Sequence, residues 1–193
     1  MKTVLITGCS SGIGLDAAHH MRGRGWRVIA TCRRDEDLEA RRAEGFDAIH
    51  LELGDEDSVA RAAETALALA RWTKETAQPA AEVAFDKTIK IKALNQASTY
   101  ICRLRNNATT GKISEHAHGN AVDIASFTLS NGKTIAIQPR DEDGTMDGAF
   151  QRAVTASACL YFKTVLDPGS DAAHETHLHL DVIERRNDYR YCR

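Results

Sequence analysis

The sequence predicts a protein of two parts, an α/β segment over residues 1–70 and an α+β domain with a mostly antiparallel sheet over residues 71–193. Three observations lead to this prediction. In the first part, short apolar runs typical of buried strands alternate with helical patterns. After about Ala70 that alternation stops, and strand-like segments follow one another. The second part also carries two histidine-rich motifs, which indicate where its chemistry lies.

The first part has the βαβαβα order of the opening half of a doubly wound sheet. Its predicted elements, in order, are a strand at 2–7, a helix to about residue 24, a strand at 27–32, a helix at 35–42, a strand at 48–53 and an Ala-rich helix beginning near Val59. Gly25 ends the first helix, as glycine commonly does. Asp55 and Ser58 lie where they can cap the last helix.

The second part begins with a further helical pattern over 72–85, interrupted by Pro79, and we expect the helix to cross the junction without a flexible linker. The later predicted elements are strands at 88–94, 98–104, 121–129, 133–137 and 177–182, and a helix at 148–163. Asn131 and Gly132 supply a hairpin turn, and Pro168 and Gly169 form a loop.

Composition and charge exclude several classes of protein. The chain has 193 residues, with 42% hydrophobic and 27% charged, which is typical of a globular protein. Its 25 basic and 27 acidic residues leave a net charge of −2, so we expect neither nucleic acid nor anionic lipid as a partner. No apolar run approaches the roughly 20 residues that span a bilayer. The N-terminus is typical of a strand rather than of a signal peptide, so the chain as written is expected in the cytoplasm. The oligomeric state is left undetermined.

The five cysteines leave at least one thiol unpaired, because their number is odd. Cys159 and Cys192 can form a disulfide in an oxidising compartment, or both can remain buried thiols. The sequence leaves both alternatives open.

A glycine-rich turn joins the first predicted strand to the first predicted helix. Its residues include Gly8, Ser11, Gly12, Ile13 and Gly14. Glycines at such a turn let the backbone approach a pyrophosphate, and the helix N-terminus offers unpaired N–H groups to it. The alternative is a turn that only connects the strand to the helix.

This T-G-x-x-x-G-I-G turn resembles that of the short-chain dehydrogenases/reductases, over about residues 1–70. The resemblance implies an α/β half-Rossmann fragment, in which Arg33 and Arg34 suit the 2′-phosphate of NADP. The family's catalytic Tyr-x-x-x-Lys pair is absent, because none of the tyrosines has a lysine four residues later. The implied function is therefore NADP binding without this proton donor.

The two histidine-rich motifs have the spacing of a metal site. His116 and Asp123 flank a turn that contains Gly119, so a ligand on the turn can be followed by one on the strand that leaves it. His177 and His179 alternate along a predicted strand, which directs both side chains to one face. Two imidazoles and one carboxylate leave a fourth position open, as in a catalytic zinc site.

The S-x-H-x-x-G-x-A-x-D and H-x-H motifs resemble those of zinc peptidases that cleave D-Ala-D-Ala and related peptidoglycan bonds, a group that shares its core fold with the hedgehog signalling domain. Segments 100–106, 113–124, 177–181 and 191–193 are also similar to the bacterial extensin-like C-terminal family. The resemblance implies His116, Asp123 and His179 as zinc ligands, with His177 as general base or transition-state donor. Glu175 is the alternative base.

For other polar residues near the motifs, the sequence leaves two assignments open. We expect Arg103 either to hold an oxyanion or substrate carboxylate or to be an exposed strand residue. Asp181 either orients a ligand imidazole or forms a plain salt bridge. His174 either bonds within the site or caps the preceding loop, and His118 is expected at the surface or behind a ligand.

The resemblances together imply a zinc-dependent peptidase-like domain acting on peptide or peptidoglycan-derived substrates. Its relatives are expected to be exported, and they usually carry a further cysteine near their start, which leaves Cys102 without a partner here. Fusion of a reductase fragment to a zinc domain accounts for both departures from the family, which are the expected lack of an export signal and the missing cysteine. The alternatives are an NADP-binding, reductase-related protein and a non-catalytic, zinc-containing module that binds the cell wall.

Overall fold

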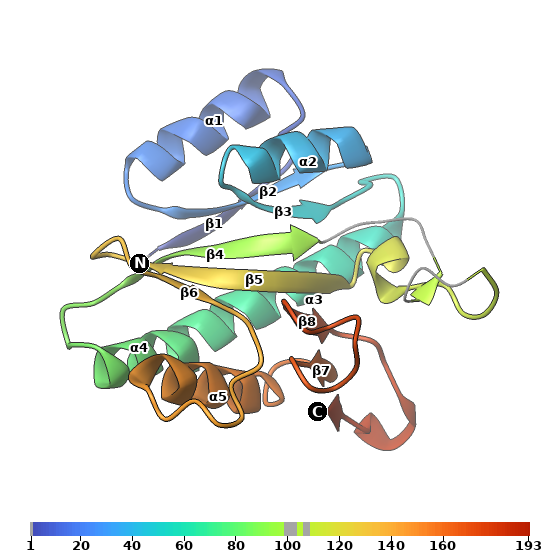
Figure 1. The fold of residues 1–193 in the computed structure, drawn as a ribbon. Coiled ribbons are helices and arrows are strands. Elements are labelled where there is room, and N and C mark those ends of the chain that lie inside the picture. Colours follow the sequence, from blue (N-terminus) through green and yellow to red (C-terminus); the bar gives the residue numbers. More distant parts are fainter. Residues whose placement is uncertain (1, 99–103, 106–108) are drawn as a thin grey trace. The chain divides into compact units, whose positions relative to one another are not determined.

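The computed structural model describes residues 2–98, 104–105 and 109–193. The chain divides into two compact units, residues 1–66 with 98–122 and residues 67–97 with 123–193. Figure 1 shows the elements of both units. None of the helices in the described residues is long and apolar enough to span a membrane.

A three-stranded parallel sheet in the order β1–β2–β3 organises the first unit. Its elements are β1 (Thr3–Ile6), α1 (Gly12–Gly23), β2 (Arg27–Cys32), α2 (Asp35–Ala43), β3 (Asp47–His50) and the start of α3 (Glu56–Trp72). The βαβαβα order is thus confirmed. The described residues contain one parallel sheet of three strands, half of what a complete doubly wound sheet has.

Apolar residues cover both faces of this sheet, as a parallel sheet requires. One face packs against α1 and α2 through a cluster that includes Ala18, Val28 and Leu38. The other face packs against the N-terminal part of α3 through a cluster that includes Ile49 and Ala62. Strand β3 ends earlier than predicted, because the chain turns at residues 52–55, where the N–H of Asp55 donates to the carbonyl of Glu52. The last bond to the sheet is the one from the N–H of Leu51 to the carbonyl of Cys32.

A continuous helical segment follows, as predicted, but its irregularity differs from the expected one. Helix α3 passes into a π-helical turn (Thr73–Ala77) and then into α4 (Gln78–Ala84). Pro79 lies at the start of α4, directly after the π turn, and the helical segment continues through it. The π turn carries the irregularity, and the hydroxyls of Thr73 and Thr76 bond to carbonyls four residues earlier.

The second sheet is mostly antiparallel and has the strand order β4–β5–β8–β7–β9, with β6 paired to β5. Its strands are β4 (Ile91–Ser98), β5 (Ala121–Leu129), β6 (Thr134–Ala136), β7 (Thr164–Leu166), β8 (Leu178–Asp181) and β9 (Tyr191–Cys192). Strand β4 begins later than predicted, because Asp86 accepts hydrogen bonds from Thr88 in a turn after α4. Most of the strand expected at 98–104 lies outside the described residues.

An aromatic core supports this sheet in the second unit. Trp72 is fully buried and its indole N–H donates to the carbonyl of Val154, 3.1 Å away. The ring of Trp72 lies 5.9 Å from that of Phe127, on β5, and 6.2 Å from that of Phe162. The core therefore joins the end of α3 to the central strand β5.

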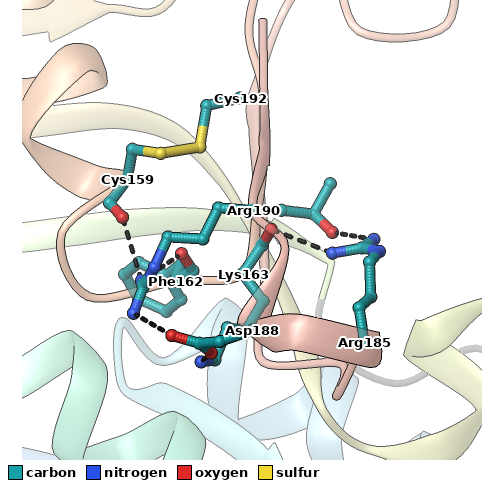
Figure 2. Close-up of a disulfide and its surroundings, with 8 residues drawn as sticks. Cys159, Phe162, Lys163, Arg185, Asp188, Arg190 and Cys192 are labelled. Carbon is teal, nitrogen blue, oxygen red and sulfur yellow. Dashed lines mark hydrogen bonds and ion pairs between the residues drawn. A yellow bond between two sulfur atoms is a disulfide. The ribbon is translucent and has the colours of Figure 1, made fainter.

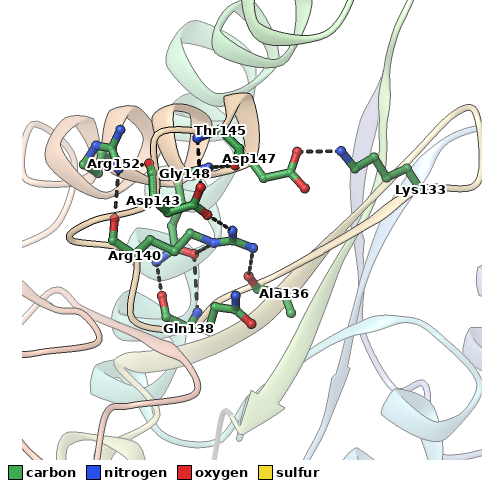
Figure 3. Close-up of polar contacts among 10 residues, drawn as sticks. Lys133, Ala136, Gln138, Arg140, Asp143, Thr145, Asp147, Gly148 and Arg152 are labelled. Carbon is green, nitrogen blue, oxygen red and sulfur yellow. Dashed lines mark hydrogen bonds and ion pairs between the residues drawn. The ribbon is translucent and has the colours of Figure 1, made fainter.

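Helix α5 (Met146–Ala158) begins two residues before its predicted start, because Thr145 caps it by accepting from the N–H of Gly148. Figure 3 shows the loop before this helix, in which Asp143 accepts from Arg140 and from the N–H of Thr145. The helix ends at Ala158, five residues before its predicted end.

A disulfide joins Cys159, at the end of α5, to Cys192 on β9, with a Cα–Cα distance of 6.1 Å (Figure 2). Arg190 strengthens the connection by donating to the carbonyls of Cys159 and Phe162. The structure thus selects the disulfide from the two alternatives, and Cys9 and Cys32 are buried free thiols.

Candidate metal site and nucleotide pocket

A short helical turn holds His116 in a fixed orientation. The 3₁₀ turn Glu115–His118 begins after Ser114, whose hydroxyl accepts from the N–H of His116, and it ends at Gly119 with φ +72°. Glu115 is buried and its carboxylate accepts hydrogen bonds from Arg105 at 2.6 Å and from Asn120 at 3.1 Å. The turn is therefore fastened on both sides, and His116 is only 2% exposed.

Strands β5 and β8, which are neighbours in the sheet, hold the other two predicted ligands. Asp123 is the third residue of β5 and is 2% exposed. His179 lies on β8 and is 8% exposed. Nδ1 of His179 stands 3.0 Å from Oδ1 of Asp123. Nε2 of His177 stands 3.6 Å from Oδ2 of the same carboxylate, so both histidines reach one face, as their alternation predicts.

His116, Asp123 and His179 together form a buried group whose ligand atoms all lie within 4.8 Å of one another. In a tetrahedral zinc site with bonds of about 2.1 Å, ligand atoms are roughly 3.4 Å apart. Two imidazoles with one carboxylate are ligand types that zinc accepts. The residues present therefore fit the metal that the motif implies.

His179 lies between two carboxylates, since its Nε2 stands 3.2 Å from Oδ2 of Asp181. Burial lowers the pKa of His179, but the hydrogen bonds and charges of Asp123 and Asp181 outweigh it and raise that pKa to about 9. Burial likewise raises the pKa of Asp181, and the hydrogen bond from His179 reverses this, leaving that pKa below its ordinary value. The two carboxylates therefore favour the protonated imidazole, and a metal ion held by Nδ1 would have to displace the proton there.

His174, whose place the sequence left open, lies beside His177 and His179. Its ring centroid lies 5.1 Å from that of His177 and 5.7 Å from that of His179. Its Nδ1 stands 2.7 Å from Oδ1 of Asp171, which holds the ring in place. The spacing H-x-x-H-x-H was the available signal, but it fixes no contact because His174 precedes the strand.

The remaining predicted residues of this site have different surroundings. His118 is exposed, and Glu175 and His177 are partly exposed. Glu175 is not one of the three residues of the metal group found in the described chain. Arg103 lies outside the described residues, so its expected role stays a prediction.

The glycine-rich turn brings its own backbone atoms close together at Gly14. A side chain at Gly14 would place its Cβ 2.4 Å from the carbonyl oxygen of Gly8, so only glycine fits there. Gly8 and Gly12 have φ of +69° and +61°, where other residues are strained. Ser11 precedes α1, but its hydroxyl does not accept a hydrogen bond from the N–H groups of the first helical turn. Ile13 is 90% exposed at the start of the helix.

A pocket lies where the three parallel strands end, at the place where doubly wound sheets bind nucleotides. Its lining includes Thr7, Gly8, Ser10, Thr31, Cys32, Arg33, Leu51, Glu52 and Leu53. Arg33 thus lines the pocket, and its guanidinium stands 3.9 Å from Glu52. Arg34 instead pairs with Glu36 at 2.9 Å and Asp37 at 2.8 Å. The structure therefore separates two arginines that the sequence treats as equivalent.

These observations define a two-part protein of mixed α/β structure, with a Rossmann-like parallel segment and a buried histidine-carboxylate site on a mostly antiparallel sheet. The model of the family described as "Extensin-like protein C-terminus" matches residues 23–193. The chain therefore belongs to the extensin-like protein C-terminus family.

Part of the chain is also similar to oxidoreductases. It is 46% identical over 68 residues to the uncharacterized oxidoreductase YbbO of Escherichia coli K12, a match that covers 35% of this chain and 25% of that protein. It is 44% identical over 63 residues to serine 3-dehydrogenase of Agrobacterium fabrum, covering 31% of this chain and 25% of that protein. The chain thus spans about a quarter of the length of these curated relatives, which supports the two-part composition.

Proposed function

We propose that the extensin-like part is a zinc-dependent hydrolase of peptide substrates of the cell-wall type. The observation that carries the proposal is the buried group of His116, Asp123 and His179, with His177 beside it. Three protein ligands leave a coordination position for the reaction, as in catalytic rather than structural zinc sites. The motif resemblance to D-Ala-D-Ala peptidases indicates the substrate class. The disulfide agrees with it, because disulfides are typical of proteins that fold in oxidising compartments.

In this proposal His116, Asp123 and His179 hold the metal. When bound, a zinc ion supplies Lewis acidity that activates water and polarises a carbonyl oxygen. His177 is suited to act as the general acid or base of the reaction. Its side chain is 16% exposed, and its Nε2 stands 3.6 Å from the buried carboxylate of Asp123. The ring of His174 packs against that of His177 at an angle of 54° and limits its movement.

Zinc-loaded protein incubated with D-Ala-D-Ala-ended peptides and cross-linked muropeptides tests the proposal. We expect wild-type protein to release D-Ala or to cut the cross-link. The His177→Gln variant should keep its zinc while its rate falls by about 10²–10⁴, the usual contribution of a general acid or base. The exposed His118 gives a matched control, because His118→Gln should change neither quantity.

Two results would contradict the proposal. Stoichiometric zinc without turnover of any of these peptides indicates a non-catalytic module that binds the wall. Wild-type protein without affinity for zinc removes the hydrolase altogether.

A second function, NADP binding by the reductase-like part, is favoured by the pocket at the strand ends and by the uncapped N-terminus of α1. A pyrophosphate suits this N-terminus, and Arg33 suits the 2′-phosphate. We expect Arg33→Ala to weaken NADPH binding but not NADH binding in a titration followed by nucleotide fluorescence. Arg34→Ala is the control, since that side chain already pairs with acidic residues of α2. Equal affinity of the wild type for both nucleotides would contradict the assignment of Arg33.

A further inference from the structure

Behind His179, on the side away from Asp123, lies a chain of hydrogen bonds that the proposed reaction does not use. Its first member is Asp181, which is 2% exposed and accepts from the backbone N–H of Ile183 at 3.2 Å. The other carboxylate oxygen stands 3.2 Å from Nε2 of His179. An ionised carboxylate can only accept, so the proton of this contact belongs to Nε2 of the histidine.

Thr164 is the next member. It lies on β7 directly opposite Asp181 in the antiparallel pairing of β7 with β8, and it is 4% exposed. Its hydroxyl thereby comes within reach of the carboxylate of Asp181 as a hydrogen-bond partner. A threonine hydroxyl can donate or accept, so by itself it does not set the direction of the chain.

Arg185 sets that direction. Its Nη2 donates to the hydroxyl oxygen of Thr164 at 2.6 Å. Its Nη1 donates to the carbonyl of Lys163 at 2.9 Å, as Figure 2 shows. A guanidinium only donates, so the hydroxyl oxygen of Thr164 accepts from it. The hydroxyl proton is then directed to Asp181. Each hydrogen bond between Arg185 and Nε2 of His179 therefore has a fixed donor and a fixed acceptor.

We propose that Thr164 and Arg185 are positioning residues that hold His179 with its proton on Nε2 and its Nδ1 directed at the metal. The inference rests on the proposed metal site and extends it by two residues that bind neither metal nor substrate. A carboxylate behind a ligand imidazole fixes the tautomer and increases ligand basicity, and Thr164 and Arg185 orient that carboxylate in turn. Burial makes the bonds strong and leaves the carboxylate no water to replace them.

The test is zinc affinity, measured by competition with a chromophoric chelator, of wild-type protein and three threonine variants. Thr164→Val keeps the shape of the side chain and removes the hydroxyl. We expect it to weaken zinc binding about 10–100-fold, the usual cost of losing a group behind a metal ligand. Thr164→Ser restores the hydroxyl and should restore the affinity.

Thr65→Val is the matched control. Thr65 is a fully buried threonine on α3, and its hydroxyl has no hydrogen-bond partner in the described chain. The same substitution there should leave zinc affinity unchanged. If Thr164→Val does not fold, Arg185→Met takes its place, because Arg185 is only half-buried and its loss leaves Thr164 free to rotate. The cobalt absorption spectrum of the loaded protein should change in the same variants.

The outcomes separate this inference from the proposed function. Wild-type protein that binds no zinc overturns both. Wild-type affinity in Thr164→Val, or equal losses in Thr164→Val and Thr164→Ser, overturns the inference alone and leaves the metal site standing. Zinc binding without peptide hydrolysis overturns the hydrolase, while the loss in Thr164→Val still supports the positioning role.

Discussion

At the scale of single residues, the two parts of the chain use different chemistry to hold a few atoms in fixed positions. In the glycine-rich turn the absence of side chains does this, because backbone atoms approach each other closely at Gly14. In the histidine site, contacts between ionised groups do it, since His179 lies between the carboxylates of Asp123 and Asp181. Both arrangements tolerate little change.

Substitution of Gly14 tests the first arrangement. A Cβ at Gly14 would lie 2.4 Å from the oxygen of Gly8 and 2.6 Å from that of Thr7, and both are backbone atoms that cannot rotate away. We expect Gly14→Ala to lower the free energy of unfolding by about 1–3 kcal/mol, as overpacking usually does. Urea denaturation measures the change. Gly23→Ala, at a helical glycine with open space around it, should be neutral or raise stability by up to about 1 kcal/mol. Equal effects at the two positions would contradict the close approach.

At the scale of elements, short segments at the end of the chain support the strand that carries His179. Strand β9 pairs with β7, and β7 pairs with β8, so that Leu166 lies opposite His179. The disulfide fastens β9 to the end of α5. The position of His179 therefore depends on contacts that include residues 191–193.

Reduction of the disulfide tests this dependence. The bond between Cys159 and Cys192 closes a loop with a sequence separation of 33 residues. A loop of that length gives a stabilisation of about 3–4 kcal/mol in the chain-entropy model. We expect a reductant to lower the denaturation midpoint of wild-type protein toward that of the Cys159→Ala, Cys192→Ala double variant. The double variant itself should not respond, and an equal response of both proteins would contradict the assignment.

The loop before α5 gives a prediction about pH. The hydrogen bonds from Thr145 and the guanidinium of Arg140 lower the pKa of Asp143 from 3.8 to about 2. A carboxyl whose pKa is lower in the folded state stabilises the protein above its unfolded pKa, and this contribution is lost as the pH falls through the folded value. Between pH 4 and pH 2 we therefore expect Asp143→Asn to lose less stability than wild type. Parallel pH profiles of the two proteins in chemical denaturation would show that Asp143 contributes nothing.

At the scale of the whole molecule, the chain joins a parallel three-stranded segment to an extensin-like part, and sequence patterns predicted much of both. Strands β2 and β5 have their predicted bounds, because long β-rich runs between turn residues are readable without tertiary information. Strands β7 and β9 were missed. They contain three and two residues, too few to show a period, and they are strands only because β8 lies beside β7.

The candidate site was predictable to the same extent. Spacing indicated His116 and Asp123 around a turn and the pair His177 and His179 on a strand, because such spacing is a local property. The family resemblance, not the spacing, implied His179 as the third ligand, and the structure brings it together with His116 and Asp123. Thr164 could not be predicted, because its place opposite Asp181 depends on the register of two strands. The difference between Arg33 and Arg34 also escaped the sequence argument, since it depends on which side chain the acidic residues of α2 engage.

The measurement that most directly tests the metal site is zinc content after equilibrium dialysis of the purified chain. We predict one zinc ion per chain in wild-type protein and in His118→Ala, and a loss of zinc in His116→Ala, Asp123→Ala and His179→Ala. All five proteins should unfold cooperatively, so that the loss reports on ligands and not on folding. Wild-type protein without zinc, or zinc retained in all three ligand variants, would contradict the account.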